Sequence, residues 1–324
     1  MLKTRITEML GIEYPIMLAP IHWLSGAEMV SAASNAGGLG IIASVTYPTA
    51  KELKEEIKKT KSMTDKPFAV NVTLLPTTRP VNYEEYLSAA IEEGVNIIET
   101  SGRSPEPYIK MLKDAKVKIM HRAARVKDIK TAERLGADIV TIVGFEAGGH
   151  PGMEDVTSLV RIPIAVDAVK VPVIAAGGIA DARGFVAALA LGAEGVCMGT
   201  RFLASKECSV HPKIKEWLLQ LEENDTIIIQ RSIKNAERVA KTDYTQRVLK
   251  MEEKGATLEE LLPLLSGNKQ RAAYISGDFS NAVMTVGQAV GLIHEIPSVA
   301  EIIEGMINKA RLIVQRLQNI GIFP

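Results

Sequence analysis

Eight short apolar segments, each separated from the next by a longer stretch, constrain the fold of this chain more than any other feature. The segments are nearly continuously apolar, as expected of parallel strands that are covered on both faces. Amphipathic, helix-like stretches lie between most of them, and this alternation implies a parallel sheet with crossover helices. Eight such strands between residues 15 and 200 favour a closed (β/α)₈ barrel, the TIM barrel, over an open sheet. The expected strands are 15–20, 39–44, 68–73, 95–102, 117–123, 139–144, 171–178 and 195–200, and the expected helices are 25–38, 49–62, 82–94, 105–115, 125–137 and 181–193.

An open, doubly wound sheet is the main alternative, and its nucleotide-binding form needs a GxGxxG turn between a strand and a helix. The nearest match is GLGIIA at 38–43. This match leads into a strand rather than out of one, so the order is wrong. We interpret its glycines as a helix cap and a turn.

The alternation of strand-like and helix-like segments stops after residue 205. Residues 212–272 contain three helical patterns with no strands between them, which predicts an appended helical unit. The last stretch, 298–321, is a long amphipathic pattern and is expected to cover the barrel wall as its eighth helix. The sequence therefore predicts a barrel over 1–211, a helical substrate or lid subdomain over 212–284, and C-terminal helices over 285–324 that pack back on the barrel.

Composition narrows the classes of partner. The chain has 324 residues, with 38 Lys and Arg against 38 Asp and Glu. This balance argues against nucleic acid and against an anionic membrane surface as partners. Two cysteines build no disulfide framework, and the sequence carries no signal-peptide pattern and no apolar run that is long enough to span a bilayer. These features predict a cytoplasmic protein.

Glycines stand at the ends of the last two expected strands, where a barrel keeps its functional groups. AAGGIAD at 175–181 and MGT at 198–200 each place bare backbone just before a helix. Backbone N–H groups and a helix N-terminus together can hold a phosphate, although such glycines also serve simple turns. Because two adjacent loops share the pattern, we favour phosphate binding.

The chemistry available from side chains is limited. The five histidines lack the spacing of metal ligands, so no metal site is predicted, and no GxSxG motif is present. A phosphate-bearing redox cofactor such as FMN would supply the missing chemistry. His150, in the glycine-rich loop GFEAGGHPG at 144–152, is the strongest catalytic candidate, with a capping or core role as the alternative. His22 also suits packing beside Trp23, His121 is expected to line the pocket or to be buried, and His211 and His294 are interpreted as structural.

Several of these motifs together resemble the nitronate monooxygenase family, which includes NADH:quinone reductases and is related to flavin-dependent enoyl-ACP reductases. The motifs are PIMLAP, NVT, GFEAGGHPG, AAGGIADARG, LGAEGVCMGTRF and SVHP, and the resemblance covers the whole chain. It implies a barrel that binds FMN without a covalent link, and it makes His150 the active-site histidine. The cofactor-binding residues that it implies are Pro20, Ile21, His22, Thr73 and Arg122 near the ring system, Ala147 and Gly148 behind it, and Ala176, Gly177, Gly178, Gly199 and Thr200 toward the phosphate.

Three reactions are compatible with these motifs. Oxidation of alkyl nitronates with O₂ ranks first, reduction of quinones by NADH or NADPH second, and reduction of an enoyl thioester third. Tyr274, in the segment 274–293 that resembles the quinone-reductase branch, is expected either to close over the flavin or to pack between helices. The expected partner is a small-molecule substrate, and a homodimer is one option for the assembly.

Overall fold

The predicted apolar runs form one parallel sheet. The computed structural model describes residues 2–74 and 81–321. The strands are β1 (Ile16–Leu18), β2 (Gly40–Ala43), β3 (Phe68–Leu74), β4 (Ile97–Gly102), β5 (Lys118–Ala123), β6 (Ile139–Val143), β7 (Val173–Ala176) and β8 (Gly195–Met198).

The sheet closes on itself. The strands pair in the order β1-β8-β7-β6-β5-β4-β3-β2, and all of these pairings are parallel. At the seam, the N–H of Leu18 donates to the carbonyl of Leu39 at 2.9 Å, and the N–H of Leu39 donates to the carbonyl of Ile16 at 3.0 Å. These two bonds join β1 to the residue before β2. The predicted TIM barrel is confirmed.

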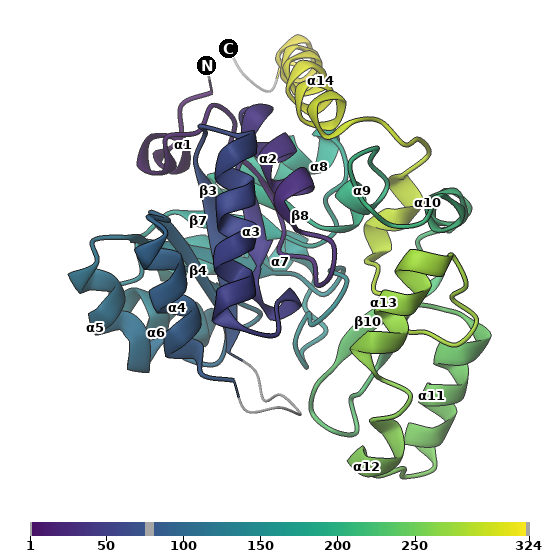
Figure 1. Ribbon diagram of the computed structural model, residues 1–324. Coiled ribbons are helices and arrows are strands. Elements are labelled where there is room, and N and C mark those ends of the chain that lie inside the picture. The colour runs from purple at the N-terminus through teal and green to yellow at the C-terminus, as the bar shows by residue number, and fades with distance from the viewer. Residues whose placement is uncertain (1, 75–80, 322–324) are drawn as a thin grey trace.

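Helices surround the barrel (Figure 1). Those that follow the first seven strands in turn are α2 (Ala27–Asn35), α3 (Ala50–Met63), α4 (Tyr83–Glu92), α5 (Glu106–Asp114), α6 (Val126–Leu135), α7 (Ser158–Ala168) and α8 (Ala182–Ala190). Helix α7 was not predicted, because the glycine-rich loop before it and Pro163 inside it hide its pattern. No helix in the described part of the chain is long and apolar enough to cross a membrane.

The C-terminal helix α14 (Val299–Asn319) packs between α8 and α2 on the outside of the barrel, where an eighth barrel helix is expected. Ile303 on its inner face is fully buried and reaches Gly38, where an added Cβ would lie 3.2 Å from the Ile303 Cδ1. A helix from more than 250 residues further along the chain therefore packs beside the seam.

Two apolar layers hold the barrel together. The inner layer consists of side chains that point into the barrel, such as Met17, Ile41 and Met120, and it includes Ile6 and Leu10 of α1 (Arg5–Leu10). Helix α1 therefore packs against the barrel interior. The larger outer layer lies between the strands and the surrounding helices. Burial in both layers leaves the carboxyl ends of the strands as the end where loops can build a site.

The region after the barrel contains more than helices. It begins with the short helices α9 (Thr200–Leu203) and α10 (Pro212–Leu218), continues through α11 (Asp243–Glu253), α12 (Leu258–Leu261) and α13 (Gly267–Ser276), and returns to α14 through the 3₁₀ turn η2 (Gln288–Leu292). Between α10 and α11, the strands β9 (Thr226–Ile229) and β10 (Glu237–Ala240) form an antiparallel hairpin. The prediction of helix without strands is therefore wrong for 226–240. Figure 1 shows this unit beside the barrel.

Replacement of Ile303 by alanine should weaken the seam. We expect Ile303→Ala to lower the free energy of unfolding by about 2–5 kcal/mol, because it removes buried methyl groups and leaves a cavity. Urea denaturation followed by circular dichroism measures the change. Leu312→Ala on the same helix is the control, since Leu312 is 64% exposed and its truncation should cost little. Equal losses in both variants would contradict the packing of α14 on the seam.

Candidate functional site

A cavity of about 700 Å³ lies at the carboxyl end of the barrel strands. This volume is in the range of pockets that enclose cofactors and small ligands, roughly 300–1,000 Å³. Its walls come from strand ends of the barrel, from the loop 144–152 and from the appended unit. Every site residue selected from the sequence lines it, namely Pro20, Ile21, His22, Thr73, Arg122, Ala147, Gly148, His150, Ala176, Gly177, Gly178, Gly199, Thr200 and Tyr274.

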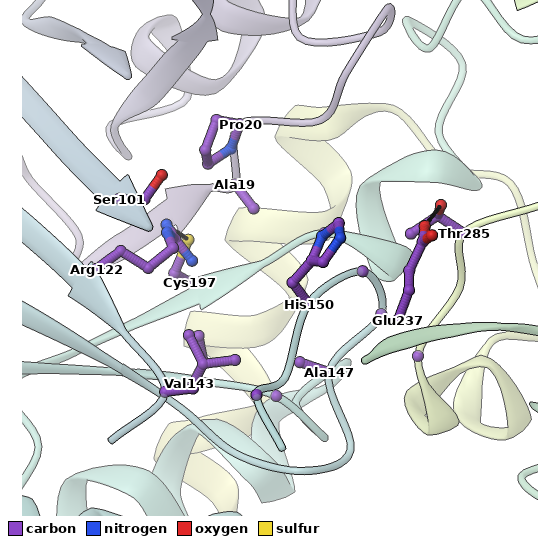
Figure 2. A pocket seen from close by; sticks show the side chains of 18 of the residues that line it. Ala19, Pro20, Ser101, Arg122, Val143, Ala147, His150, Cys197, Glu237 and Thr285 are labelled. Carbon is purple, nitrogen blue, oxygen red and sulfur yellow. Dashed lines mark hydrogen bonds between the residues drawn. The ribbon is translucent and has the colours of Figure 1, made fainter. Parts of the chain in front are cut away.

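A buried ion pair lies at the barrel side of the cavity. The Nη2 of Arg122 donates to the Oε1 of Glu99 at 2.9 Å and to the Sγ of Cys197 at 3.1 Å. Glu99 is fully buried, and its Oε2 accepts from the Nδ2 of Asn71 at 2.8 Å. Figure 2 shows Arg122 and Cys197 together at the strand ends, with Ser101 beside them. An unpaired carboxylate at the position of Glu99 would be very costly, so the pair is a necessary part of the barrel interior.

The surroundings keep Arg122 charged and Cys197 neutral. Burial acts against the charge of Arg122, but the neighbouring Cys197 and Glu99 outweigh burial and raise the pKa of the guanidinium. Burial raises the pKa of the Cys197 thiol above its usual range. The Nε of Arg122 is buried and has no hydrogen-bond partner among the described residues. Arg122 also lines the cavity, so its guanidinium borders any molecule that binds there.

Two adjacent glycine turns border the cavity at the ends of β7 and β8. Gly177 and Gly178 have φ angles of +103° and +74°, which other residues rarely adopt. Gly199 and Thr200 follow β8, and β7 pairs directly with β8. The two turns therefore meet on one wall, as the phosphate prediction requires.

The helix dipole contributes less to this wall than predicted. The side chain of Asp181 caps α8 by accepting from the N–H groups of Arg183 at 2.8 Å and Gly184 at 3.4 Å. The positive end of this helix already faces a carboxylate, so an anion on the wall depends mainly on the backbone of the turns.

The loop that carries His150 is attached to the appended hairpin. Gly149 and Arg238 of β10 exchange two backbone hydrogen bonds, at 3.1 and 2.7 Å. The Arg238 Nε also donates to the carbonyl of Phe145 at 3.0 Å, and its guanidinium lies over the Phe145 ring. Gly148 packs against the backbone of Gly287, where a Cβ would approach the Gly287 nitrogen to 2.7 Å. These contacts fix the loop from outside the barrel.

His150 is exposed at the cavity, and its Nε2 lies 3.2 Å from the Nδ2 of Asn235. Figure 2 places its ring between Arg122 on one side and Glu237 with Thr285 on the other. A histidine so placed can donate to or accept from a molecule in the cavity. The position agrees with a catalytic role, which stays a prediction.

Of the other histidine and aromatic residues considered from the sequence, some line the cavity and others have structural positions. His22 lines the cavity, stacks on Trp23 with the ring centroids 4.2 Å apart, and has its pKa lowered to about 4 by burial. His121 is buried, with its Nδ1 2.9 Å from the Thr100 Oγ1, so the buried alternative holds. His211 caps α10. Tyr274 is buried at the cavity wall, and burial raises the pKa of its hydroxyl.

The whole chain matches proteins of known families. The profile of the nitronate monooxygenase family matches residues 3–309. The chain belongs to the nitronate monooxygenase family. It is therefore an oxidoreductase, and proteins of this family typically bind a flavin.

Three similar proteins differ in their names and in the share of this chain that they cover. The (3aS,4S,5R,7aS)-5-hydroxy-7a-methyl-1-oxo-octahydro-1H-indene-4-carboxyl-CoA dehydrogenase of Rhodococcus jostii is 30% identical over 99% of this chain and 98% of its own length. A probable nitronate monooxygenase of Staphylococcus saprophyticus is 35% identical over 70% of this chain and 75% of its own. A solved structure of FabK from Thermotoga maritima has a TM-score of 0.92 and 37% identity, with 99% of this chain and 100% of that chain covered.

Sequence reasoning missed the part of the cavity that the appended unit supplies. Asn235, Glu237, Gln270 and Thr285 all line it. No motif singles them out, because they lie in a hairpin and loops whose position depends on tertiary contacts. Glu99 did carry a signal, since a charged residue in an otherwise apolar buried strand requires a partner.

Protonation of His121 should destabilise the fold in acid. Burial lowers its pKa to about 4, whereas an unfolded histidine titrates near 6.5. The unfolded state therefore binds the proton first, and stability is lost as the pH falls from about 6.5 to about 4, by at most about 3 kcal/mol for this ring. Urea denaturation at pH 7 and pH 4.5 measures the loss.

The variant His121→Asn keeps a partner for Thr100 and removes the titration. We expect it to lose less stability than the wild type between these two pH values, whatever its stability at pH 7. His294→Asn, at an exposed position, is the control and should follow the wild type. An unchanged pH dependence in His121→Asn would contradict the prediction.

Proposed function

We propose that this protein is an FMN-dependent oxidoreductase that reduces the double bond of a 2-enoyl thioester, with NADH or NADPH as the electron donor. The observation that carries the proposal is the likeness over the full length of the chain to a CoA-thioester dehydrogenase and to FabK. The probable nitronate monooxygenase is similar over only 70% of the chain. Oxidation of alkyl nitronates, ranked first from the sequence, is therefore the second candidate, and quinone reduction the third.

The residues of the cavity fit FMN. The wall formed by Gly177, Gly178 and Gly199 offers backbone N–H groups to a phosphate without side chains in the way. Ala147 and Gly148 line the cavity, and a flat ring system would lie against this part of the loop. Arg122, which lines the cavity and whose Nε lacks a partner among the described residues, would supply a cationic group near an electron-rich edge of such a ring.

Each group would then have one task. Thr200, whose Oγ1 accepts from the N–H of Gly287 at 2.9 Å, has its own hydroxyl proton left for a phosphate oxygen. Arg122, with Glu99 as its partner, would hold a fixed positive charge at the ring. FMN supplies the hydride chemistry that no side chain can provide. Pro20, Ile21, His22, Thr73, Ala147 and Ala176 would shape the walls around it.

His150 would act on the substrate. Addition of a hydride at the β-carbon of an enoyl thioester places negative charge on the carbonyl oxygen, and a ring N–H beside this oxygen stabilises that charge. The same N–H would bind an oxygen of a nitronate. Tyr274 would contribute to the buried wall, and its buried, neutral hydroxyl is unsuited to act as a base.

A sequence of anaerobic mixing experiments separates the candidates. We expect the purified protein to be yellow and to release FMN on denaturation. NADH or NADPH should bleach the flavin absorbance, and a 2-enoyl-CoA such as crotonyl-CoA should then restore it. Bleaching by an alkyl nitronate, with none by either nicotinamide, would establish the nitronate reaction instead. Restoration by a quinone and not by crotonyl-CoA would establish the third candidate.

His150→Ala should lower kcat for crotonyl-CoA by about 100-fold, because it removes a donor that acts on the developing negative charge. The flavin content should be unchanged, since the phosphate wall is intact. His294→Ala is the matched control and should keep the wild-type rate. Full turnover in His150→Ala would remove His150 from the mechanism and leave the FMN assignment untouched.

A further inference from the structure

The appended hairpin carries a chain of hydrogen bonds that ends at His150. The Asn235 Nδ2 donates to the Gln230 Oε1 at 2.8 Å and lies 3.2 Å from the His150 Nε2. The Gln230 Nε2 donates to the Oε2 of Glu237, the first residue of β10. On the far side, the Thr285 Oγ1 donates to the Glu237 Oε1 at 2.9 Å and accepts from Gln270.

Glu237 sets the donor-to-acceptor direction of this series of hydrogen bonds. A carboxylate can only accept, so the amide group of Gln230 must turn its NH₂ toward Glu237. The Gln230 oxygen then faces Asn235, and this turns the NH₂ of Asn235 toward Gln230. Both hydrogens of that NH₂ are used, one on Gln230 and one on the His150 Nε2. The bond to His150 therefore has a defined donor.

A ring nitrogen that accepts a hydrogen bond carries no proton, so the proton of neutral His150 must lie on Nδ1. No hydrogen bond from the described residues engages Nδ1. It is the donor that His150 retains for a molecule in the cavity. The backbone bonds between Gly149 and Arg238 join the loop to the hairpin next to His150.

We propose that Glu237, acting through Gln230 and Asn235, fixes His150 as the Nδ1–H tautomer and makes it a hydrogen-bond donor to the substrate rather than a base. Glu237, Gln230 and Asn235 are positioning residues, since they act through His150. The tautomer rests on the hydrogen-bond chain alone, whereas its effect on thioester reduction rests on the proposed function.

The tautomer can be measured directly. In the intact protein labelled with ¹⁵N-histidine, long-range ¹H–¹⁵N correlation distinguishes a protonated from an unprotonated ring nitrogen, and His150→Gln identifies the His150 signals. We expect a protonated Nδ1 and an unprotonated Nε2 near pH 7.5 in the absence of substrate. A protonated Nε2 in the wild type would overturn the proposal, whether or not the protein binds FMN.

Asn235→Asp should reverse the tautomer. The aspartate can only accept, so the proton of His150 should move to Nε2, and Nδ1 should become an acceptor. With a thioester substrate, kcat should fall by about 100-fold, as expected when a donor to the developing charge is lost, while KM changes less. Asn96→Asp, an exposed asparagine beside the amino end of β4, is the matched control and should leave the tautomer and kcat unchanged.

Glu237→Gln tests the origin of the direction. The variant has the same shape but can present either an oxygen or an NH₂ to Gln230, so the amide chain is free to turn. We expect both tautomers of His150 in the spectrum of this variant. A single Nδ1–H form in Glu237→Gln or in Asn235→Asp would show that the hairpin does not select the tautomer. A reversed tautomer with unchanged kcat would instead contradict the role of His150 in the proposed reaction.

Discussion

Closure of the parallel sheet is the constraint on which the rest of the structure depends. Only when β1 pairs with β8 and bridges to the start of β2 do all eight strands present their carboxyl ends around one opening. The bridge is short, with one residue pair, and Ile303 of α14 packs beside it at Gly38. The C-terminus of the chain therefore secures the geometry of loops that lie far earlier in the sequence.

The interior of the barrel combines two different kinds of packing. Below the strand ends, the inner layer is apolar and packs against α1. At the strand ends it changes to Asn71, Glu99 and Arg122, which are hydrogen-bonded to one another. Burying these charges is unfavourable, and paired burial seldom adds stability over an apolar core. A cluster of this kind at the floor of a cavity is better explained by a function, such as a charge held at a fixed place against a ligand.

The sequence was sufficient for the barrel and for the residues that come from it. Strand periodicity, apolar runs and glycine turns are local signals, and strand ends of a closed barrel must meet, so Arg122, Gly177 and Thr200 could be placed in one cavity without coordinates. Helix α7 was not predicted from the sequence, because Pro163 and the preceding glycines mask its helical pattern. The hairpin was not predicted either, because each of its strands has only four residues and the sequence segments on both sides have strongly helical patterns. The roles of Asn235 and Glu237 depend on the tertiary contact between Asn235 and His150, which no local pattern predicts.

This division suggests where reactions diverge within the family. The barrel supplies a cavity and a charged floor that suit one class of cofactor, and it is specified by robust local patterns. The appended unit supplies the groups around His150, and under the proposed role of His150 a change of a single atom there, such as the amide of Asn235 to a carboxylate, would exchange a donor for an acceptor at the substrate. A donor suits a substrate that accumulates negative charge on oxygen, whereas an acceptor suits one that must lose a proton. On this proposal, the hairpin would redirect the chemistry of the same barrel without any change in the wall that is proposed to hold the cofactor.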